Sequence, residues 1–279
     1  MLHKLYVLLF FLICTPFFIQ AQNRGQTRFL TKDDIIFKRE FNMGIKAHTN
    51  GFGLSAHFVK IHDIYKKTVY EIGITDIKHP KEFRQQSLFA SGRTTARGFV
   101  YGKRNNFYTL NASVGKIRII ADKGRKSGVQ VSYYYGGGAS LGIVKPYILQ
   151  LIYGISEAGE YLYEPVRYTE ENANFFLNQA LIYGAAGPTY GWAFVKPAPG
   201  IQAKVSVMFD WANYNEFVKA IEIGAMANAY AFLEKRYKAV DGQIVEDGLK
   251  LGRIPILVGD NNSFVFANFY VRMLFGKRW

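Results

Sequence analysis

The stretch FVFANFYVRMLFGKRW, Phe264–Trp279, stands at the end of the sequence and alternates apolar with polar residues. One face would carry Val265, Ala267, Phe269, Val271, Met273 and Phe275, and the opposite face Asn268, Tyr270 and Arg272. Strict period two over about ten residues is typical of a membrane-spanning β-strand. Soluble antiparallel sandwiches also alternate, but their strands usually have only about five or six residues. The length of the stretch therefore favours a transmembrane β-barrel.

Seven further segments show the same alternation, which predicts that most of the chain is antiparallel sheet. They are Phe41–Ala47, Phe52–Phe58, Tyr70–Thr75, Tyr108–Val114, Val129–Tyr135, Ile201–Trp211 and Ile221–Ala231. Asn50-Gly51, between the first two segments, is a strong signal for a tight hairpin. Tyr147–Tyr153 is also strand-like, although only Gln150 marks a polar face there.

The strand count follows from a rule of topology. Bacterial barrels have an even number of strands, short periplasmic turns and longer outer loops. The visible segments number nine, and counting back from the last one leaves 77–106 as a long periplasmic loop. A tenth strand at Ala96–Gly102, with Lys103–Asn106 as a tight turn, removes the conflict. We therefore predict an all-β, antiparallel up-and-down barrel of about ten strands, with eight or twelve as alternatives.

The outer loops predicted by this count are long. They are Ile155–Gly200 and Lys235–Asn261. Within the first, Thr169–Leu181 predicts a short helix with Thr169 as its cap. Gly136–Gly138 lacks the Gly-Lys-Ser/Thr ending of a phosphate-binding loop, so we interpret it as a strand bend or bulge.

The first 21 residues have the three-part layout of a secretory signal peptide. His3 and Lys4 form a basic start, Leu5–Ile13 is an apolar run, and cleavage is predicted after Ala21. The run is too short to span a membrane as a helix. Two alternatives remain, an N-terminal anchor helix and a lipoprotein signal at Cys14, although the bulky Ile13 suits lipoprotein processing poorly.

The mature chain would then consist of a periplasmic segment, 22–37, and a barrel, 38–279, with both termini in the periplasm. It would contain no cysteine, so no disulfide framework is expected. The formal net charge of +14 becomes +13 when Lys4 is removed. This excess predicts an anionic neighbour, and lipid headgroups or lipopolysaccharide suit an exported protein better than nucleic acid. A solvated basic surface is the alternative.

The alternation also assigns a set of charged residues to the barrel interior. They are Lys46, Glu71, Lys204, Asp210, Glu222 and Arg272. The interior of a barrel of eight to ten strands is mostly filled by side chains. Buried charges there should form a paired network, because an unpaired buried charge is costly. The prediction is a plugged, rigid lumen, and a narrow polar pore is the alternative.

The C-terminal pattern Val271, Met273, Phe275 and Trp279 resembles the terminal signal of barrels inserted by the outer-membrane assembly machinery. It departs from that signal at Lys277, where an apolar residue would be usual. The last strand must close on the first, because no open sheet edge is tolerated in lipid.

Three sequence features resemble uncharacterised outer-membrane β-barrel proteins of Bacteroidota. They are the cleavage site Ala21-Gln22, the segment VYGKRNNFYTL at Val100–Leu110, and GGGASLGIVKP at Gly136–Pro146. The resemblance extends over most of the mature chain and rests on diffuse patterns. It implies the barrel fold and a location in the outer membrane, and it brings no functional residues to carry over.

The sequence predicts no catalytic, cofactor-binding or metal-binding residues. It contains no Gly-x-Ser-x-Gly elbow and no His-Glu-x-x-His zinc motif. His57, His62, Asp63 and His79 match no standard ligand spacing, so we interpret the histidines as ordinary surface residues. His48 is the one tempting general base, and no nucleophile is paired with it.

Three function classes remain. The first is a non-enzymatic structural or accessory subunit of a secretion or uptake complex, which would contact other envelope proteins through loop 155–200. Aromatic residues, which are enriched at interfaces, favour this class: Tyr161, Tyr163, Phe175, Phe176, Tyr183, Tyr190 and Trp192. The second is a small porin or transporter for a polar solute. The third is a lipid-modifying barrel enzyme.

Overall fold

The structure is a computed structural model that describes residues 37–89, 96–123, 128–157, 160–212, 216–240, 243–259 and 262–279, the side chains of 234–240 and 243–251 excepted. The predicted signal peptide 1–21 and almost all of the predicted segment 22–37 lie outside these residues and stay predictions. Everything below concerns the unit Ile36–Trp279.

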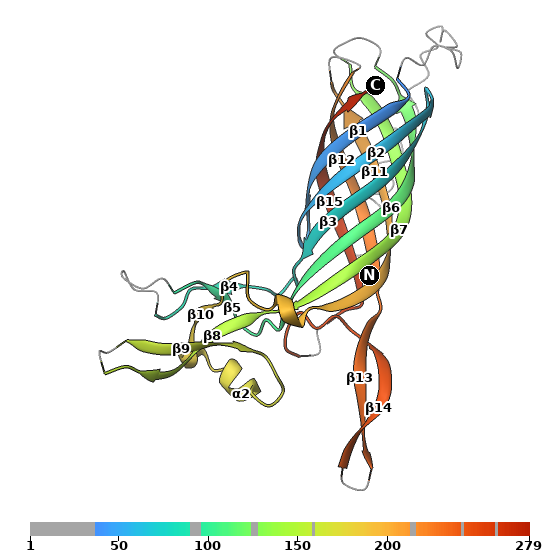
Figure 1. Cartoon of the computed structure of the whole chain (residues 1–279). Helices are drawn as coiled ribbons and strands as arrows, with labels where there is room; N and C mark the ends of the chain where they lie inside the picture. Colours follow the sequence, from blue (N-terminus) through green and yellow to red (C-terminus); the bar gives the residue numbers. More distant parts are fainter. Residues whose placement is uncertain are drawn as a thin grey trace, which may run out of the picture. The chain divides into compact units, whose positions relative to one another are not determined.

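Eight antiparallel strands form a closed barrel in the order β1-β15-β12-β11-β7-β6-β3-β2 (Figure 1). They are β1 (Arg39–His48), β2 (Gly51–Asp63), β3 (Lys66–Ile77), β6 (Asn105–Ala121), β7 (Gln130–Pro146), β11 (Lys196–Asp210), β12 (Phe217–Tyr230) and β15 (Val265–Arg278). The last strand closes on the first, from Glu40↔Arg278 to His48↔Tyr270, as predicted. Each barrel strand is thereby paired on both sides, so the barrel has no open edge.

Side-chain alternation explains why these segments form a barrel. On β11, Gln202, Lys204 and Ser206 point inward and are buried, whereas Val205 and Val207 point outward and are exposed. The other barrel strands follow the same period, which confirms the predicted alternation. The result is an interior that contains many buried polar and charged side chains and an exterior that is largely apolar.

The β1–β2 hairpin turns at Thr49 and Asn50, because His48 pairs with Gly51. Gly51 has φ of +148°, and a Cβ at this position would overlap the carbonyl of Asp76. The hairpin predicted from Asn50-Gly51 is therefore confirmed, with the glycine just after the turn rather than inside it. A glycine in this place fixes the register of the first two strands.

The preferred count of about ten strands was wrong, and the barrel has eight, which was one of the two alternatives. In Ala96–Gly102 only β5 (Phe99–Val100) is paired, with the short β4 (Arg84–Gln85), away from the barrel. Tyr147–Tyr153 belongs to β8 (Ile148–Ile155), which pairs with β9 (Tyr161–Arg167) and β10 (Ile182–Ala185) in a separate sheet. Tyr147–Tyr153 has no polar face because it does not border the lumen; its buried residues Leu149 and Leu151 pack in an apolar core outside the barrel. When Ala96–Gly102 and Tyr147–Tyr153 are left out, eight predicted strands remain, an even number as expected for a bacterial barrel.

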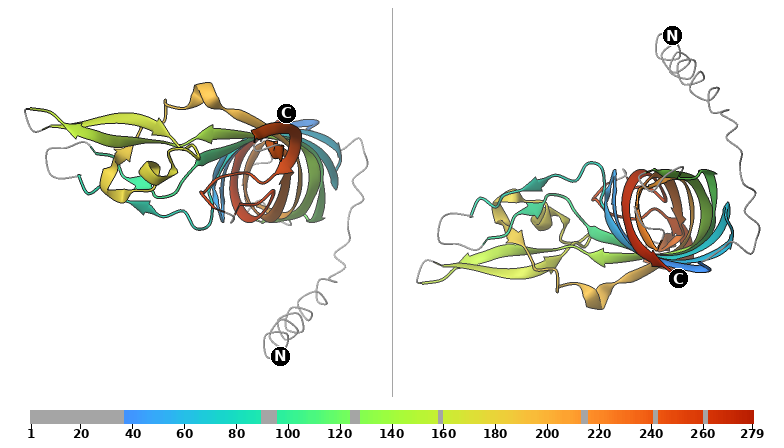
Figure 2. Two further views of the ribbon diagram at one scale, coloured as in Figure 1. Left: turned by 90° about the horizontal axis from the view of Figure 1, so that it is seen from below. Right: turned by 90° about the horizontal axis from the view of Figure 1, so that it is seen from above.

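Three long connections, which we call the first, second and third excursions, leave the end of the barrel opposite the one where β1 begins and β15 ends. They are residues 78–104, 147–195 and 231–264 (Figures 1 and 2). The second contains the separate sheet, and the third contains a hairpin of β13 (Phe232–Val240) and β14 (Gln243–Gly252). No helix in the described residues is long and apolar enough to cross a membrane.

Two local predictions need correction. The helix predicted over Thr169–Leu181 is only α2 (Ala173–Phe176), followed by a short 3-10 turn at Gln179–Leu181. Thr169 does not cap it directly; its hydroxyl accepts from the Asn172 N–H, and Asn172 accepts in return from the Thr169 N–H.

Gly136–Gly138 is neither bend nor bulge, because β7 stays in register with both neighbours there. A Cβ on Gly138 would overlap the backbone at Ala112, so the glycine permits close strand approach.

Candidate functional site

All six charged residues predicted to face the lumen are buried inside the barrel, each at 3% exposure or less. The structure brings Glu71, Lys204, Glu222 and Arg272 together in one group, which we call the central cluster. Lys46 lies beside this cluster, and Asp210 belongs to a second group nearer the termini. Strand register explains the core of the cluster, because Arg272 of β15 stands opposite both Glu222 and Lys46.

Arg272 is the centre of the cluster and is completely buried. One terminal nitrogen lies 3.2 Å from Glu71 Oε2 and donates to Ser55 Oγ at 3.2 Å and to His57 Nε2. The other donates to Glu222 Oε1 at 3.2 Å. A guanidinium that joins two carboxylates across the lumen crosslinks strands that are not neighbours in the sheet.

The two carboxylates have further donors. The Lys204 ammonium donates to Glu71 Oε2. Glu222 Oε1 accepts from the Tyr270 hydroxyl at 2.5 Å and from Ser206 Oγ at 2.7 Å. These bonds satisfy buried charge on both sides, as a buried ion pair requires.

Aromatic rings cover the cations. Lys204 Nζ lies 5.4 Å from the Tyr134 ring centroid, and the Arg272 guanidinium lies 5.2 Å from that of Tyr270. A Cβ on Gly115 would overlap the Tyr134 ring, so this glycine makes room for it. Lys46 Nζ lies 5.8 Å from the Tyr270 centroid and donates to Met226 Sδ at 3.6 Å. The middle of the lumen thus holds three cationic side chains and two carboxylates.

A second charged group, the terminus-side cluster, contains Asp210. Its members are Glu40, Lys67, Lys123, Asp210 and Arg278. Glu40 Oε2 accepts from Lys67 Nζ and Arg278 Nε, each at 2.9 Å, and Arg278 also donates to Asp210 Oδ2 at 2.6 Å.

Sequence reasoning missed five of the residues in or against these clusters: Glu40, His57, Lys67, Lys123 and Arg278. Three of them share the inward parity of a predicted partner on the same strand: Glu40 with Lys46, Lys67 with Glu71, and Arg278 with Arg272. Extending each alternating segment to its end would have found these three. His57 was assigned to the surface, and its inward position on β2 makes that interpretation wrong.

Apolar and neutral layers fill the rest of the lumen. The apolar layer beside the two clusters consists of Val59, Val69, Ile117, Tyr134, Met208, Val218, Ala220 and Leu274. Towards the excursions, Ser140 Oγ donates to Asn111 Oδ1 at 2.6 Å and lies 2.8 Å from the Tyr230 hydroxyl. Beyond them comes a second apolar layer: Ile77, Phe107, Val144, Ala198, Tyr230, Phe232, Ile254, Ile256 and Phe266. Side chains therefore occupy the lumen from end to end.

A segment of the third excursion folds into the barrel mouth, and we call residues 253–258 the mouth strap. Ile254 and Ile256 are buried in the second apolar layer. Backbone bonds hold the strap, since the N–H groups of Arg104 and Asn105 donate to the Ile256 carbonyl at 2.9 and 3.1 Å. The Asn105 amide also donates to the Pro255 carbonyl at 2.5 Å.

The first and second excursions share an apolar core, which lies outside the barrel. This core consists of Phe99, Leu149, Leu151, Phe176, Ile182 and Ala185. The Tyr147 hydroxyl accepts from the Val100 N–H at 3.1 Å, and burial raises the pKa of this phenol. Five of the predicted aromatics are exposed, namely Tyr161, Tyr163, Phe175, Tyr190 and Trp192. Phe176 and Tyr183 are buried, so they help to fold the excursion instead of facing solvent.

The histidines do not converge. Both ring nitrogens of His48 are engaged, Nε2 with the Asp76 carbonyl at 3.1 Å and Nδ1 with the Asn50 N–H at 3.3 Å. His62 contacts Thr68 on the exterior, and His79 lies in the first excursion. Among the described residues no group of three or more His, Cys, Asp and Glu could hold a metal ion.

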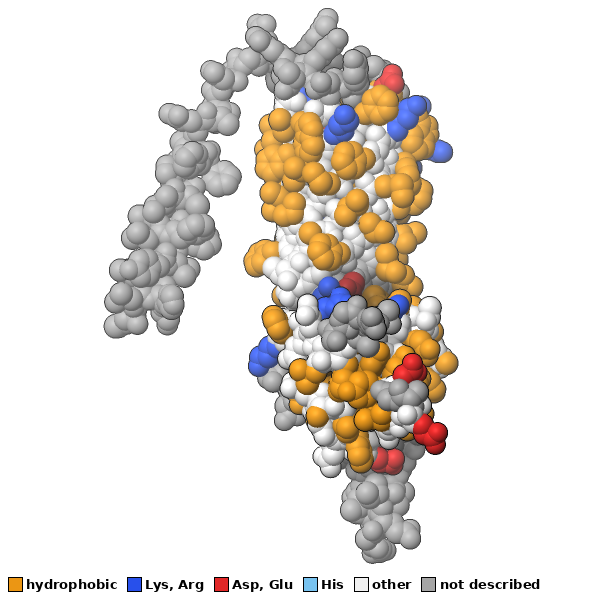
Figure 3. Space-filling view, turned by 90° about the vertical axis from the view of Figure 1, so that its left-hand side faces the viewer, with side chains coloured by type: hydrophobic (Ala, Val, Ile, Leu, Met, Phe, Trp, Pro, Cys, Tyr) orange, Lys and Arg blue, Asp and Glu red, His pale blue; other side chains and the backbone are white. Residues whose placement is uncertain are grey.

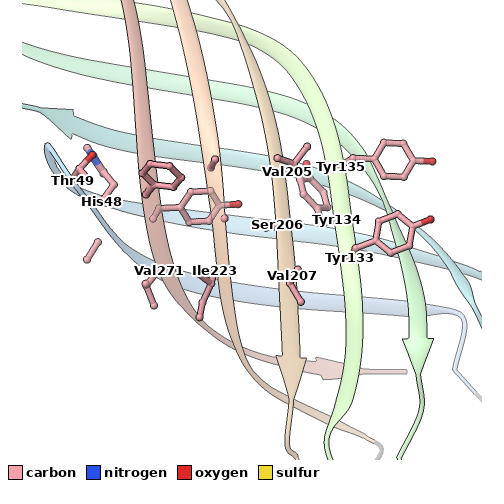
Figure 4. Close-up of a pocket in the computed structure, with 15 residues that line it drawn as sticks. His48, Thr49, Tyr133, Tyr134, Tyr135, Val205, Ser206, Val207, Ile223 and Val271 are labelled. Atoms are coloured by element: carbon pink, nitrogen blue, oxygen red, sulfur yellow. The ribbon is translucent and has the colours of Figure 1, made fainter. Parts of the chain in front are cut away.

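The hollow drawn in Figure 4 lies on the outer wall and not in the lumen. It is lined mainly by outward residues of five neighbouring strands: Ala47, Tyr133, Tyr135, Val205, Val207, Ile223, Ala225, Phe269 and Val271. Its lining is almost entirely apolar, so it belongs to the exterior wall and offers no path for a polar solute.

The residues of the predicted assembly signal lie on the outer face of the last strand. Val271, Met273 and Phe275 are exposed there, and so is Lys277, which breaks the apolar pattern. The Trp279 carbonyl accepts from the N–H groups of Lys38 and Arg39 at 3.0 Å each, which extends the β1–β15 pairing. The role of this pattern in assembly remains a prediction.

Comparison with known proteins gives little beyond the fold. No family model matches the sequence, and no curated protein matches it. A similar solved structure is that of Ail, the attachment invasion locus protein of Yersinia pestis, in complex with the heparin analogue sucrose octasulfate. The similarity covers 86% of this chain and 94% of that one, with 10% identity and a TM-score of 0.31. A structural similarity with so low an identity and TM-score gives no information about the function of this protein. The fold class rests on the strand pairing described above, and the resemblance to Bacteroidota proteins remains a prediction.

Proposed function

We propose that this protein is a closed outer-membrane barrel that acts as a non-enzymatic accessory subunit of an envelope complex, with its excursions as the docking surface. The observation that carries this proposal is the filled lumen. Two charged clusters and two apolar layers of the described residues occupy the lumen, which argues against passage of a solute. The excursions, in contrast, expose aromatic side chains of the kind that interfaces use.

The exterior supports a membrane location. On β15 the outward residues from Val265 to Phe275 are all uncharged. Ten residue steps of about 3.3 Å, tilted by about 40°, span roughly 25 Å along the barrel axis. Outer-membrane barrels have an apolar band of about this height. Both termini and the shorter connections then belong to the periplasm, and the excursions to the outside. A source among the Bacteroidota is part of this proposal.

Arginine substitutions on the outer wall test the membrane location. Val205→Arg, in the middle of β11, should lower the unfolding free energy in lipid vesicles by about 2–4 kcal/mol, because the charge meets the bilayer midplane. The matched control is Val265→Arg at the excursion end of β15, where about 0–1 kcal/mol is expected. Urea titration of the refolded protein measures both. Equal losses at the two positions would contradict a lipid-facing wall.

A native pull-down from detergent-extracted outer membranes tests the accessory role. The tagged protein should bring down a stoichiometric partner, identified by mass spectrometry. Replacing the exposed excursion aromatics Tyr161 and Phe175 with Ser should reduce the partner yield roughly tenfold or more, as loss of interface aromatics does. The control replaces Tyr65 and Phe217, which are similarly exposed at the terminus end. A protein recovered alone, or equal losses in both variants, would refute docking through the excursions.

A further inference from the structure

Seven outward-facing cations gather at the end of the barrel where β1 begins and β15 ends, which we call the terminus side. They are Arg39, Lys60, Lys66, Lys116, Arg118, Lys219 and Lys277, and we call them the terminus-side ring. They come from six of the eight barrel strands, all except β7 and β11. Arg118 is half-buried and the other six are exposed. Figure 3 shows Lys and Arg side chains at this end, above a zone of hydrophobic ones.

Ion pairing does not explain the ring. Among the described residues none of its seven members forms an ion pair. At this end of the barrel Glu40 and Asp210 are buried and bound by inward cations, and the more exposed Asp63, Asp122 and Glu216 form no ion pair with the ring. Register places members close together, since Arg39 pairs with Lys60, and Lys66 with Arg118. Like charges directly opposite each other in a sheet are destabilising unless an external anion compensates them.

The ring borders the apolar wall directly. Beyond it, the outward positions of the described barrel strands are uncharged until Asp76, which lies at the excursion end. Aromatic rings are interleaved with the cations, such as Phe41 and Phe58, whose centroids are 5.1 Å apart. Lys and Arg can extend from an apolar surface to the headgroup level of a bilayer, where aromatic side chains also gather.

We infer that the terminus-side ring binds the phosphate groups of an anionic phospholipid leaflet. The inference rests on the proposed function, because the wall must first lie in a membrane, and it then assigns the ring to the periplasmic leaflet of the outer membrane. Charge complementarity and the position at the edge of the apolar wall carry it. Binding on six strands would fix both the depth and the tilt of the barrel, so that the excursions are presented at a constant height.

The test uses the refolded full-length protein in phosphatidylcholine vesicles that contain spin-labelled phosphatidylglycerol or spin-labelled phosphatidylcholine. Electron spin resonance measures the fraction of each lipid immobilised on the barrel. Wild type should prefer phosphatidylglycerol by roughly fivefold at low salt. High salt should largely remove the preference, because it screens exposed charges.

A matched pair of variants locates the binding. Combining Lys60→Gln, Lys66→Gln and Lys219→Gln should reduce the preference at least about twofold. Combining Lys78→Gln, Lys81→Gln and Lys196→Gln, which removes three exposed cations at the excursion end, should leave it unchanged. Equal preference for both lipids in a folded, inserted barrel would overturn the inference and leave the proposed function standing. Stronger immobilisation of lipid A than of phosphatidylglycerol would also overturn it. Failure to insert into any vesicle would reject the proposed function itself.

Discussion

Replacing Glu71 with Gln should lower the unfolding free energy of the barrel by about 3–5 kcal/mol, which is the usual cost of removing one partner of a buried ion pair. Glu71 is the carboxylate that Lys204 and Arg272 share. Without its charge, Lys46, Lys204 and Arg272 would face Glu222 alone. Glutamine keeps the shape, so the loss reports charge rather than packing. Urea titration in vesicles, followed by tryptophan fluorescence, measures it.

A second substitution separates this effect from general damage. Lys204→Met in the Glu71→Gln background removes one excess cation and should restore a large part of the loss, although each single change is destabilising. Glu216→Gln serves as the control, because this carboxylate is exposed at the terminus end and its loss should change stability by no more than about 0.5 kcal/mol. Additive losses in the double variant would contradict a coupled cluster.

The lumen residues could be found from sequence because alternation is a local property. Once Ile201–Trp211 is recognised as a strand with Val205 on its outer face, Lys204 must point inward. The same logic places Glu222 and Arg272. Which cation meets which carboxylate depends on the shear of the closed barrel, because Glu71 and Arg272 belong to strands that are not neighbours. Period two along one strand contains no information about that shear.

The strand count failed for a related reason. β8 alternates like a barrel strand, yet Leu149 and Leu151 are buried in the core that the first and second excursions share. An isolated segment does not reveal whether its apolar face meets lipid or a small protein core. The sequence did contain a sign that Tyr147–Tyr153 is not a barrel strand. Only Gln150 is polar in this segment, whereas a strand that borders this lumen has several polar inward residues. The sequence did not predict that the mouth strap enters the barrel, because Ile254 and Ile256 stand on either side of a proline in a segment that was predicted to be a loop.

Removing the apolar side chains of the mouth strap should destabilise the barrel without opening it. Ile254→Ala and Ile256→Ala should each cost about 2–5 kcal/mol, because both side chains are fully enclosed in the apolar layer at the mouth. The double variant need not equal the sum, since the two residues share neighbours. Thermal unfolding of the folded barrel by gel mobility, with Leu233→Ala at an exposed position as control, measures the loss.

The same variants distinguish a plugged scaffold from a gated pore. In planar bilayers the wild type should pass no steady current, and neither should the Ile254→Ala, Ile256→Ala double variant. The central cluster still closes the lumen behind the strap, with Arg272 bound to carboxylates from two sides. A gate would behave differently, because loss of its apolar side chains would let ions enter a lumen lined by charge. Steady current from the double variant alone would therefore favour the small-porin alternative, with the strap as its gate.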